Sequence, residues 1–379
     1  MGSRTISRRH FVAASGAAAG AALLTPRLTG SIAEASLPLG VPDDFIQLNS
    51  NENPYGLSPT ALEALARSGK VGSRYPDAQE DEAREAIASR HRVKAAQVVL
   101  GCGSSDILRM ADAAFLGSGK TVVAAEPTFE AVLLYAGVMR AGAVKVPLTS
   151  DFRHDLPAMA AACGEKTGLV YVCNPNNPTG TVVEGADLAA FLDRVPPSAA
   201  VLVDEAYFHF VEDPRYASAL DLLDRHPNVI VARTFSKIYG MAGMRLGYAI
   251  ASESNAEALA REASWNNTNA AGLSIAMACL GDPNLVPTQK KRLNDTKRWL
   301  YSELERYGRR YIPSQANFLM IDVGRDVTPV IAAFRQNKIL VGRKFPSLSS
   351  WLRVSIGTRE QMEAFLKGLQ AIVPAKAAA

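Results

Sequence analysis

The sequence predicts an α/β protein whose main domain is a doubly wound, mostly parallel sheet. Short, apolar, β-branched runs of the kind that form buried parallel strands alternate with longer segments that have helical periodicity. The runs lie at residues 98–100, 121–125, 168–172, 200–203 and 229–232. Because the chain has 379 residues, of which 48% are hydrophobic, it can bury a larger core than one compact domain usually needs.

Helices are expected before and between these runs. The first covers residues 58–67, where Ser58 is a suitable cap and Pro59 suits the first turn. Others are expected at residues 77–91, 105–115 and 130–141. Beyond Gly247 the chain is expected to be helical for a long stretch, at residues 256–262, 272–280 and 284–307.

A smaller α+β unit is expected after Pro313. Its strands are predicted at residues 317–323, 339–342 and 352–356, and its helices at residues 327–337 and 359–370. We therefore expect an N-terminal arm that also forms part of the small domain, a large α/β domain and a small C-terminal domain, over residues 36–75, 76–282 and 283–379.

The first 35 residues have the pattern of an export signal. Arg8 and Arg9 precede an uncharged run from Phe11 to Leu24, which is too short to span a bilayer comfortably, and a small-x-small site ends at Ala35. The S-R-R-x-F pattern resembles a twin-arginine signal. We expect export by that route, to the periplasm, with no stable membrane span. The alternative is a buried Ala-rich helix with two chance arginines.

Charge and metal-ligand spacing narrow the classes of function. The net charge is +4, from 41 basic and 37 acidic residues that are interspersed along the chain, so nucleic acid is not an expected partner. The four cysteines form no C-x-x-C pair and the five histidines form no H-x-x-x-H or H-E-x-x-H motif. No metal site is expected.

Four polar clusters follow predicted strands directly. They are Gly103-Ser104-Ser105, the N-P-N-N-P-T-G segment at 174–180, the D-E-A-Y segment at 204–207, and the T-F-S-K segment at 234–237 with the later Arg245. Glycines let a backbone approach a ligand closely, and a helix N-terminus offers free N–H groups to a phosphate. Because ligands of doubly wound folds bind at the carboxyl ends of the strands, we expect the four clusters to form one site.

These clusters supply the groups that pyridoxal phosphate (PLP) chemistry requires. It needs a lysine amine to form the imine, a carboxylate to keep the pyridine nitrogen protonated, and a donor to the phenolic oxygen. Hydroxyl groups, an arginine and helix N–H groups must hold the phosphate. The motifs N-P-N-N-P-T-G, D-E-A-Y and S-K with a later arginine are jointly very specific.

On these motifs the sequence resembles the fold-type I PLP aminotransferases of classes I and II, and within them the histidinol-phosphate aminotransferase family. The resemblance extends from Asn49 to the C-terminal helix. It implies the PLP-dependent transferase fold and a homodimer. It also implies transamination between an amino acid, or an amino-alcohol phosphate such as histidinol phosphate, and a 2-oxo acid such as 2-oxoglutarate.

The resemblance also implies the roles of single residues. Lys237 matches the Schiff-base lysine and proton carrier, Asp204 the partner of the pyridine nitrogen, and Asn177 and Tyr207 the donors to the phenolic oxygen. Phe129 matches the ring that stacks on the cofactor, and Tyr75 a tyrosine that reaches the phosphate of the neighbouring subunit. The remaining cofactor contacts fall on Gly103, Ser104, Ser105, Thr234, Ser236 and Arg245.

Substrate contacts are implied for Arg353, as the clamp of the α-carboxylate, and for Asn53, Asn177 and Arg343. A planar guanidinium fork suits a bidentate contact with a carboxylate. Arg343 either binds an acidic or phosphorylated part of the substrate or pairs with a surface acid.

Two other functions share these motifs. A PLP-dependent lyase or decarboxylase would need the same cofactor residues. A non-catalytic binding module could keep the fold, although the intact Lys237, Asp204 and Arg353 argue against it. Cofactor motifs do not encode the substrate. Because histidine is made in the cytoplasm, an exported relative is expected to act on another amino acid or amine.

Overall fold

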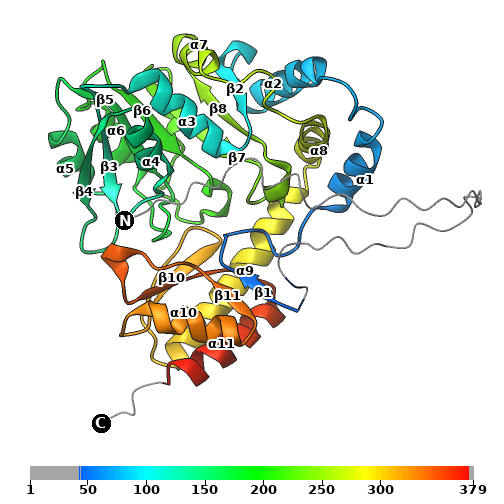
Figure 1. Cartoon of the computed structure of the whole chain (residues 1–379), viewed down its shortest axis with the longest axis vertical. Helices are drawn as coiled ribbons and strands as arrows, with labels where there is room; N and C mark the ends of the chain where they lie inside the picture. Colours follow the sequence, from blue (N-terminus) through cyan, green and yellow to red (C-terminus); the bar gives the residue numbers. More distant parts are fainter. Residues whose placement is uncertain (1–41, 43, 375–379) are drawn as a thin grey trace, which may run out of the picture. The chain divides into compact units, whose positions relative to one another are not determined.

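The apolar runs of the sequence form a seven-stranded sheet in a computed structural model, which describes residue 42 and residues 44–374 (Figure 1). The strand order is β2-β8-β7-β6-β5-β3-β4. The strands are β2 (Val98–Gly101), β3 (Thr121–Glu126), β4 (Gly142–Pro147), β5 (Thr167–Cys173), β6 (Ala200–Asp204), β7 (Val229–Thr234) and β8 (Gly247–Ala251). Strands β3 to β7 pair in parallel, whereas β8 runs antiparallel to β2 and β7.

Successive strand residues face opposite sides of this sheet, and each side has its own core. Val123 and Val170 pack with α5 (Leu156–Ala161) and α6 (Gly185–Leu192). Ala124 and Leu169 pack with residues of α3 (Ser104–Phe115), α4 (Ala131–Val138) and α7 (Glu253–Arg261). Because helices cover both faces, the strands are apolar throughout, as expected for a doubly wound sheet.

The chain before and after the sheet adds further helices. The helices α1 (Pro59–Ser68) and α2 (Asp77–His91) both pack against α8 (Ala270–Gly281). Ser58 caps α1 by accepting the N–H of Ala61, and Pro59 occupies its first turn. Short 3₁₀ turns are η2 (Ala95–Gln97), η3 (Phe208–Phe210), η4 (Ala219–Leu222), η5 (Ala242–Met244) and η6 (Pro346–Leu348).

The C-terminal part is built on a second, antiparallel sheet. Its order is β12-β10-β9, with β9 (Tyr311–Ile312), β10 (Phe318–Asp322) and β12 (Trp351–Ser355). The helices are α9 (Leu285–Arg306), α10 (Val327–Gln336) and α11 (Arg359–Ile372). The N-terminal arm joins this part, because β1 (Ile46–Leu48) pairs in parallel with β11 (Ile339–Val341) (Figure 1).

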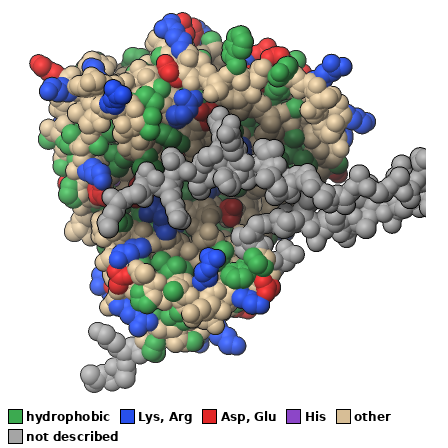
Figure 2. Space-filling view, viewed as in Figure 1, with side chains coloured by type: hydrophobic (Ala, Val, Ile, Leu, Met, Phe, Trp, Pro, Cys, Tyr) green, Lys and Arg blue, Asp and Glu red, His purple; other side chains and the backbone are tan. Residues whose placement is uncertain are grey.

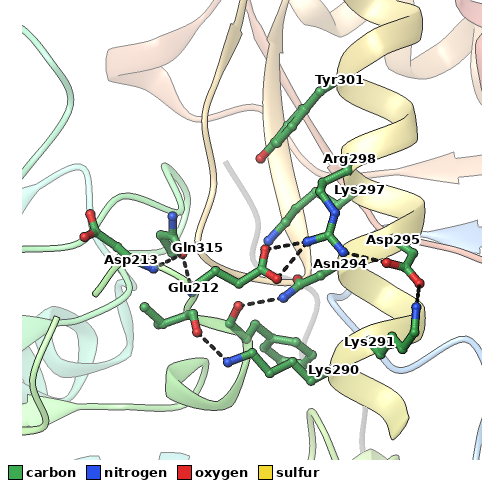
Figure 3. A network of polar contacts seen from close by, with 12 residues as sticks. Glu212, Asp213, Lys290, Lys291, Asn294, Asp295, Lys297, Arg298, Tyr301 and Gln315 are labelled. Atoms are coloured by element: carbon green, nitrogen blue, oxygen red, sulfur yellow. Dashed lines mark hydrogen bonds and ion pairs between the residues drawn. The ribbon is translucent and has the colours of Figure 1, made fainter. Parts of the chain in front are cut away.

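A polar network connects the long helix α9 to the loop after β6 (Figure 3). Arg298 holds both carboxylate oxygens of Glu212 at 2.7 and 2.9 Å. Asn294 donates to the carbonyl of Phe210 at 3.0 Å, and Lys290 donates to that of Val211 at 2.6 Å. These contacts hold residues 210–212, which follow Asp204 and Tyr207 in the sequence, against α9. They therefore help to fix the loop that carries two of the predicted site residues.

Three expectations about the elements were wrong or incomplete. The chain beyond Gly247 does not turn helical at once, because Gly247–Ala251 forms the buried strand β8; its glycine and alanines give it weak strand propensity. The run at 98–100 was expected to pair in parallel, but β2 pairs with β8 in the antiparallel sense. The edge strand β4 and the helices α5 and α6 were not predicted.

Other expectations are limited by what the structure describes. The export signal at 1–35 lies outside the described residues. The domain boundaries at 75/76 and 282/283 stay predictions, because residues from Asp44 onward cluster as one compact unit. Among the described helices, none combines the length and apolar character needed to cross a membrane. Within the same residues, no three His, Cys, Asp or Glu side chains lie together as a metal site would require.

Candidate active site

A cavity of about 470 Å³ lies at the carboxyl ends of β5, β6 and β7, beside the N-terminus of α3. Most of the residues predicted from the sequence line it together. They are Ser104, Ser105, Phe129, Asn177, Asp204, Tyr207, Thr234, Ser236, Lys237, Arg245, Arg343 and Arg353. The four polar clusters of the sequence therefore form one site, as expected.

Lys237 places its amine inside this cavity. The Nζ atom donates to the carbonyl of Ser50 at 3.2 Å and lies 5.6 Å from the centre of the Tyr207 ring. Burial, with a smaller contribution from the positive charge of Arg353, lowers the pKa of Lys237 to about 8. An amine with this pKa is partly neutral near neutral pH, which a nucleophile or a general base requires.

Asp204 is the buried carboxylate of the site. One of its oxygens, Oδ2, accepts from the phenol of Tyr171 at 2.9 Å, and Oδ1 accepts from the backbone N–H of Ala206 at 3.1 Å. Burial raises the pKa of Asp204 to about 6, although both hydrogen bonds and the charge of Lys237 act in the opposite direction. Asp204 is therefore charged at neutral pH and can pair with a protonated ring nitrogen.

Asn177 and Tyr207 are both left with a donor to offer. The Oδ1 atom of Asn177 accepts from Nη1 of Arg353 at 2.7 Å, which leaves its amide N–H groups for another partner. The phenolic oxygen of Tyr207 accepts from Nδ2 of Asn51 at 3.1 Å, which leaves the O–H as a donor. Burial raises the pKa of Tyr207, so the phenol stays protonated.

The opposite end of the cavity has the character of an anion site. Ser104 and Ser105 open α3, whose first N–H groups have no partner within the helix. Gly103 precedes them with φ +80°, and a Cβ atom there would lie 2.2 Å from Nη2 of Arg245. Arg245 also donates to Ser236 Oγ at 3.4 Å. Only glycine leaves room for this arginine beside the helix N-terminus.

Arg353 is a cationic fork near the floor of the cavity. It is only 8% exposed, and Nη2 donates to the carbonyl of Asn49 at 2.7 Å. Its buried Nε has no hydrogen-bond partner among the described residues. A guanidinium that lacks one partner in a cavity fits a bidentate contact with an incoming carboxylate or phosphate.

Three predicted residues do not line the cavity. Gly103 acts through the space that it leaves for Arg245. Asn53 points elsewhere: its amide donates to the carbonyl of Ile238 at 3.1 Å, so it supports the chain next to Lys237. Tyr75 is 78% exposed and lines a separate surface hollow with residues 266 and 268–271.

The structure adds residues that the sequence did not indicate. Asn51 adopts φ +55° and binds both Tyr207 and Ser355. Tyr171 holds Asp204 from the neighbouring strand. Phe345 lines the cavity between two arginines. Glu205, the neighbour of Asp204, faces away from the cavity and forms a buried ion pair with Arg233 at 2.7 Å.

These residues fit PLP. One cavity is lined by the amine of Lys237, the buried carboxylate of Asp204, two hydrogen-bond donors and an anion site. Because Gly103 has no side chain, Arg245 can lie close to its backbone at the anion site. The cofactor would be held by Lys237, Asp204 and the donors of the anion site.

The face drawn in Figure 2 carries basic side chains scattered among acidic and apolar ones, with no continuous basic band.

A doubly wound sheet with this constellation at its carboxyl edge defines a PLP-dependent transferase. The chain belongs to the family described as aminotransferase class I and II, which residues 43–369 match. It is thus a PLP-dependent aminotransferase, and the related proteins favour transamination over the lyase or decarboxylase alternative.

Named relatives agree with this family. The chain is 41% identical over 345 residues to a histidinol-phosphate aminotransferase of Moorella thermoacetica, covering 90% of this chain and 89% of the relative. It is 38% identical over 284 residues to an aromatic amino acid aminotransferase of Cutibacterium acnes, covering 75% and 81%.

A solved structure extends the likeness to three dimensions. The histidinol-phosphate aminotransferase of Sinorhizobium meliloti, in complex with pyridoxal-5'-phosphate, has a TM-score of 0.82 and 25% identity, covering 86% of this chain and 90% of that one.

Proposed function

We propose that this aminotransferase moves an amino group from an amino acid, or from an amino-alcohol phosphate such as histidinol phosphate, to a 2-oxo acid such as 2-oxoglutarate. The observation that carries the proposal is the placement of Lys237 and Arg353 in one cavity. The amine has a pKa of about 8, and the guanidinium has a buried Nε without a partner among the described residues. One group can move a proton while the other holds the acid end of the donor.

The residues of the chain then divide the work. Arg353, supported by Asn49 and Asn177, binds the carboxylate or phosphate of the donor and so orients its α-carbon. The neutral amine of Lys237 takes the proton that this carbon releases. PLP, when bound, supplies an electron sink for the charge left on the carbon. Asp204 would supply the negative charge that keeps the pyridine nitrogen protonated.

A donor and acceptor screen tests this function. The purified protein, loaded with PLP, is incubated with phenylalanine, histidine or histidinol phosphate and with 2-oxoglutarate, and the glutamate formed is measured. We expect one glutamate for each donor molecule consumed. Release of carbon dioxide or ammonia without a 2-oxo acid would instead support the decarboxylase or lyase class.

A homodimer is part of the proposal. The exposed aromatic side chains of Tyr75 (78%) and Trp265 (98%) support it, because such rings are typical of surfaces that a partner covers. In a two-fold dimer Tyr75 of each subunit would reach the phosphate site of the other. Sedimentation at micromolar concentration, with a matched Tyr75→Ala, Trp265→Ala variant, measures the assembly. A wild-type protein that stays monomeric would contradict it.

Export is also part of the proposal. Its support is the sequence Ser7-Arg8-Arg9-His10-Phe11 before an uncharged run and the small residues around Glu34. An exported enzyme would meet amino acids outside the cytoplasm, which favours a donor other than histidinol phosphate. Replacement of Arg8 and Arg9 by lysines should leave the protein in the cytoplasm. Equal periplasmic amounts of wild type and variant, measured by cell fractionation, would refute twin-arginine export.

A further inference from the structure

We propose that Glu130 sets which acid end the donor can carry. The carboxylate of Glu130 forms an ion pair with Arg343 and neutralises its charge. The site therefore favours donors with one negative charge, such as a carboxylate, over donors with two, such as a phosphate monoester. This inference rests on the proposed aminotransferase function and names a residue that selects among its donors.

Glu130 lies at the point where the cavity meets solvent. It follows Phe129, which lines the cavity, and it precedes the first turn of α4. Its Oε2 atom accepts from Nη2 of Arg343 at 2.7 Å. Arg343 lines the cavity and comes from the C-terminal part of the chain, just after β11. The ion pair therefore connects the two sides of the entrance.

Arg343 and Arg353 act on the same space. Their guanidinium carbons lie 4.3 and 5.4 Å from the centre of the Phe345 ring. Arg353 is the buried cation and Arg343, with a side chain that is 50% exposed, is the outer one. The charge of Arg343 also contributes, after burial, to the lowered pKa of Arg353, so the two cations are electrostatically coupled.

A donor with a single carboxylate is satisfied by Arg353 alone. A phosphate monoester carries close to two negative charges, and the second charge needs Arg343, the outer cation, as its partner. Glu130 already neutralises that cation, so the second charge of the phosphate finds no free partner there. Because the pair is half-exposed, its strength is modest, and the result is a bias between donors that are both able to enter.

Two charged side chains close to Arg343 and Glu130 in the sequence are paired with other groups. Lys344, which follows Arg343, holds Asp326. Glu126, four residues before Glu130, holds Lys145 at 2.8 Å. Glu52 also lines the cavity, but among the described residues the ion pair of Arg343 is with Glu130, so removal of Glu130 changes the charge of the outer cation most directly.

Histidine and histidinol phosphate provide a matched test, because both carry the same imidazole and differ in the acid end. We expect Glu130→Gln to raise the ratio of kcat/KM for histidinol phosphate over histidine by about 10-fold, and Arg343→Gln to lower it by a similar factor. The double variant should behave like Arg343→Gln alone, because Glu130 acts through that arginine. Glu253→Gln is the control, since Glu253 forms an exposed 2.8 Å pair with Lys94 far from the cavity.

A binding measurement separates this proposal from the proposed reaction. Ethyl phosphate and ethyl sulfate are alike in shape but carry two charges and one charge near pH 8. Calorimetric dissociation constants for PLP-loaded protein should show about 10-fold tighter binding of ethyl phosphate to Glu130→Gln than to wild type, with ethyl sulfate little changed. If wild type uses neither of these two donors, this measurement still tests Glu130. The proposed aminotransferase function fails only if no donor of the screen yields glutamate.

Three results would overturn the role of Glu130. The first is a donor ratio that shifts by less than about 2-fold in Glu130→Gln. The second is a change in the donor ratio that is equally large when Glu130→Gln is made in wild type and when it is made in Arg343→Gln. The third is equal tightening of ethyl phosphate and ethyl sulfate, which would indicate an effect on access and not on charge.

Discussion

The phenol of Tyr171 donates a 2.9 Å hydrogen bond to Oδ2 of Asp204, across two neighbouring strands of the main sheet. The N–H of Ala206 holds the other carboxylate oxygen at 3.1 Å. Both oxygens are thus fixed, and the carboxylate has one orientation toward the cavity. Burial raises the pKa of Asp204 to about 6, and these two hydrogen bonds keep it from rising further.

Loss of either partner should weaken catalysis in a graded way. Asp204→Asn removes the charge itself, and we expect kcat to fall by a factor of about 10² to 10³, the range found when a preorganised electrostatic contact is removed. Tyr171→Phe keeps the charge but loses one hydrogen bond, so we expect a loss of about 10-fold. Steady-state rates with phenylalanine and 2-oxoglutarate measure both.

The pH dependence of PLP binding distinguishes a positioning role of Tyr171 from a structural one. The cofactor-free protein needs an ionised Asp204, so affinity should be lost as the pH falls through about 6. Removal of the phenol raises the pKa of Asp204, so Tyr171→Phe should lose affinity at a higher pH than wild type. Tyr301→Phe is the control, since that phenol donates to Ser314 outside the cavity. Parallel curves for Tyr171→Phe and wild type would exclude the role.

The sequence was sufficient to predict the location of the site residues that follow strands. Asp204 and Lys237 come directly after apolar runs, so the edge at which they meet could be deduced from the direction of parallel strands. Tyr171 could not be found in this way. It lies within an apolar run, where a tyrosine is indistinguishable from a core aromatic, and its partner is set by the pairing of β5 with β6.

Contacts between distant parts of the sequence were the other gap. Asn51 meets Ser355 across 304 positions, and Glu130 meets Arg343 across 213. No local pattern encodes such pairs, because they depend on how the C-terminal part packs on the main sheet. The strand β8 was missed for a different reason: Gly247, Ala249 and Ala251 fill it with small residues that have weak strand propensity.

Gly103→Ala should weaken PLP binding, because a Cβ atom would lie 2.2 Å from Nη2 of Arg245 and displace that arginine from the anion site. Gly119→Ala is a matched control, since Gly119 also has positive φ (+85°) but a Cβ atom there would have no neighbour within 4 Å. Both variants carry the backbone strain of alanine at positive φ. We expect the dissociation constant for PLP to rise by about 10-fold or more in Gly103→Ala alone.

Fluorescence titration of the cofactor-free proteins measures these constants. An equal change in both variants would show that backbone strain, and not the position of Arg245, accounts for the effect.

Lys297 should make stability rise with pH. It is 3% exposed within the network of Figure 3 and donates to the carbonyl of Ala316 at 3.0 Å. Burial lowers its pKa from 10.5 to about 7. Below pH 7 the lysine is charged in both the folded and the unfolded chain. Between about 7 and 10.5 the folded chain releases a proton that the unfolded chain retains, so the free energy of unfolding increases.

Urea denaturation at pH 6.5, 7.5 and 8.5 tests this. The free energy of unfolding of wild type, relative to Lys297→Met, should rise by about 1 kcal/mol per pH unit above pH 7. Lys291→Met is the control on the same helix, because Lys291 is 77% exposed and pairs with Asp295. If the difference between wild type and Lys297→Met stays constant with pH, Lys297 does not titrate in this range.

Tyr75 should complete the active site of a partner subunit. It is 78% exposed and lies outside the cavity of its own chain, in the segment that leads into α2. In a two-fold dimer each subunit both gives and receives this contact, so every site depends on two chains. Tyr75→Ala and Lys237→Ala should therefore each be nearly inactive when pure.

A heterodimer of the two variants would place both lesions in one site and leave the other intact. We expect about half of the wild-type activity per heterodimer, measured after mixing and subunit exchange. The pure Tyr75→Phe protein is the control for the phenolic oxygen, because it keeps the ring and loses only that oxygen in both sites. Heterodimers that form but stay inactive, or a monomer with full activity, would show that Tyr75 belongs to its own chain alone.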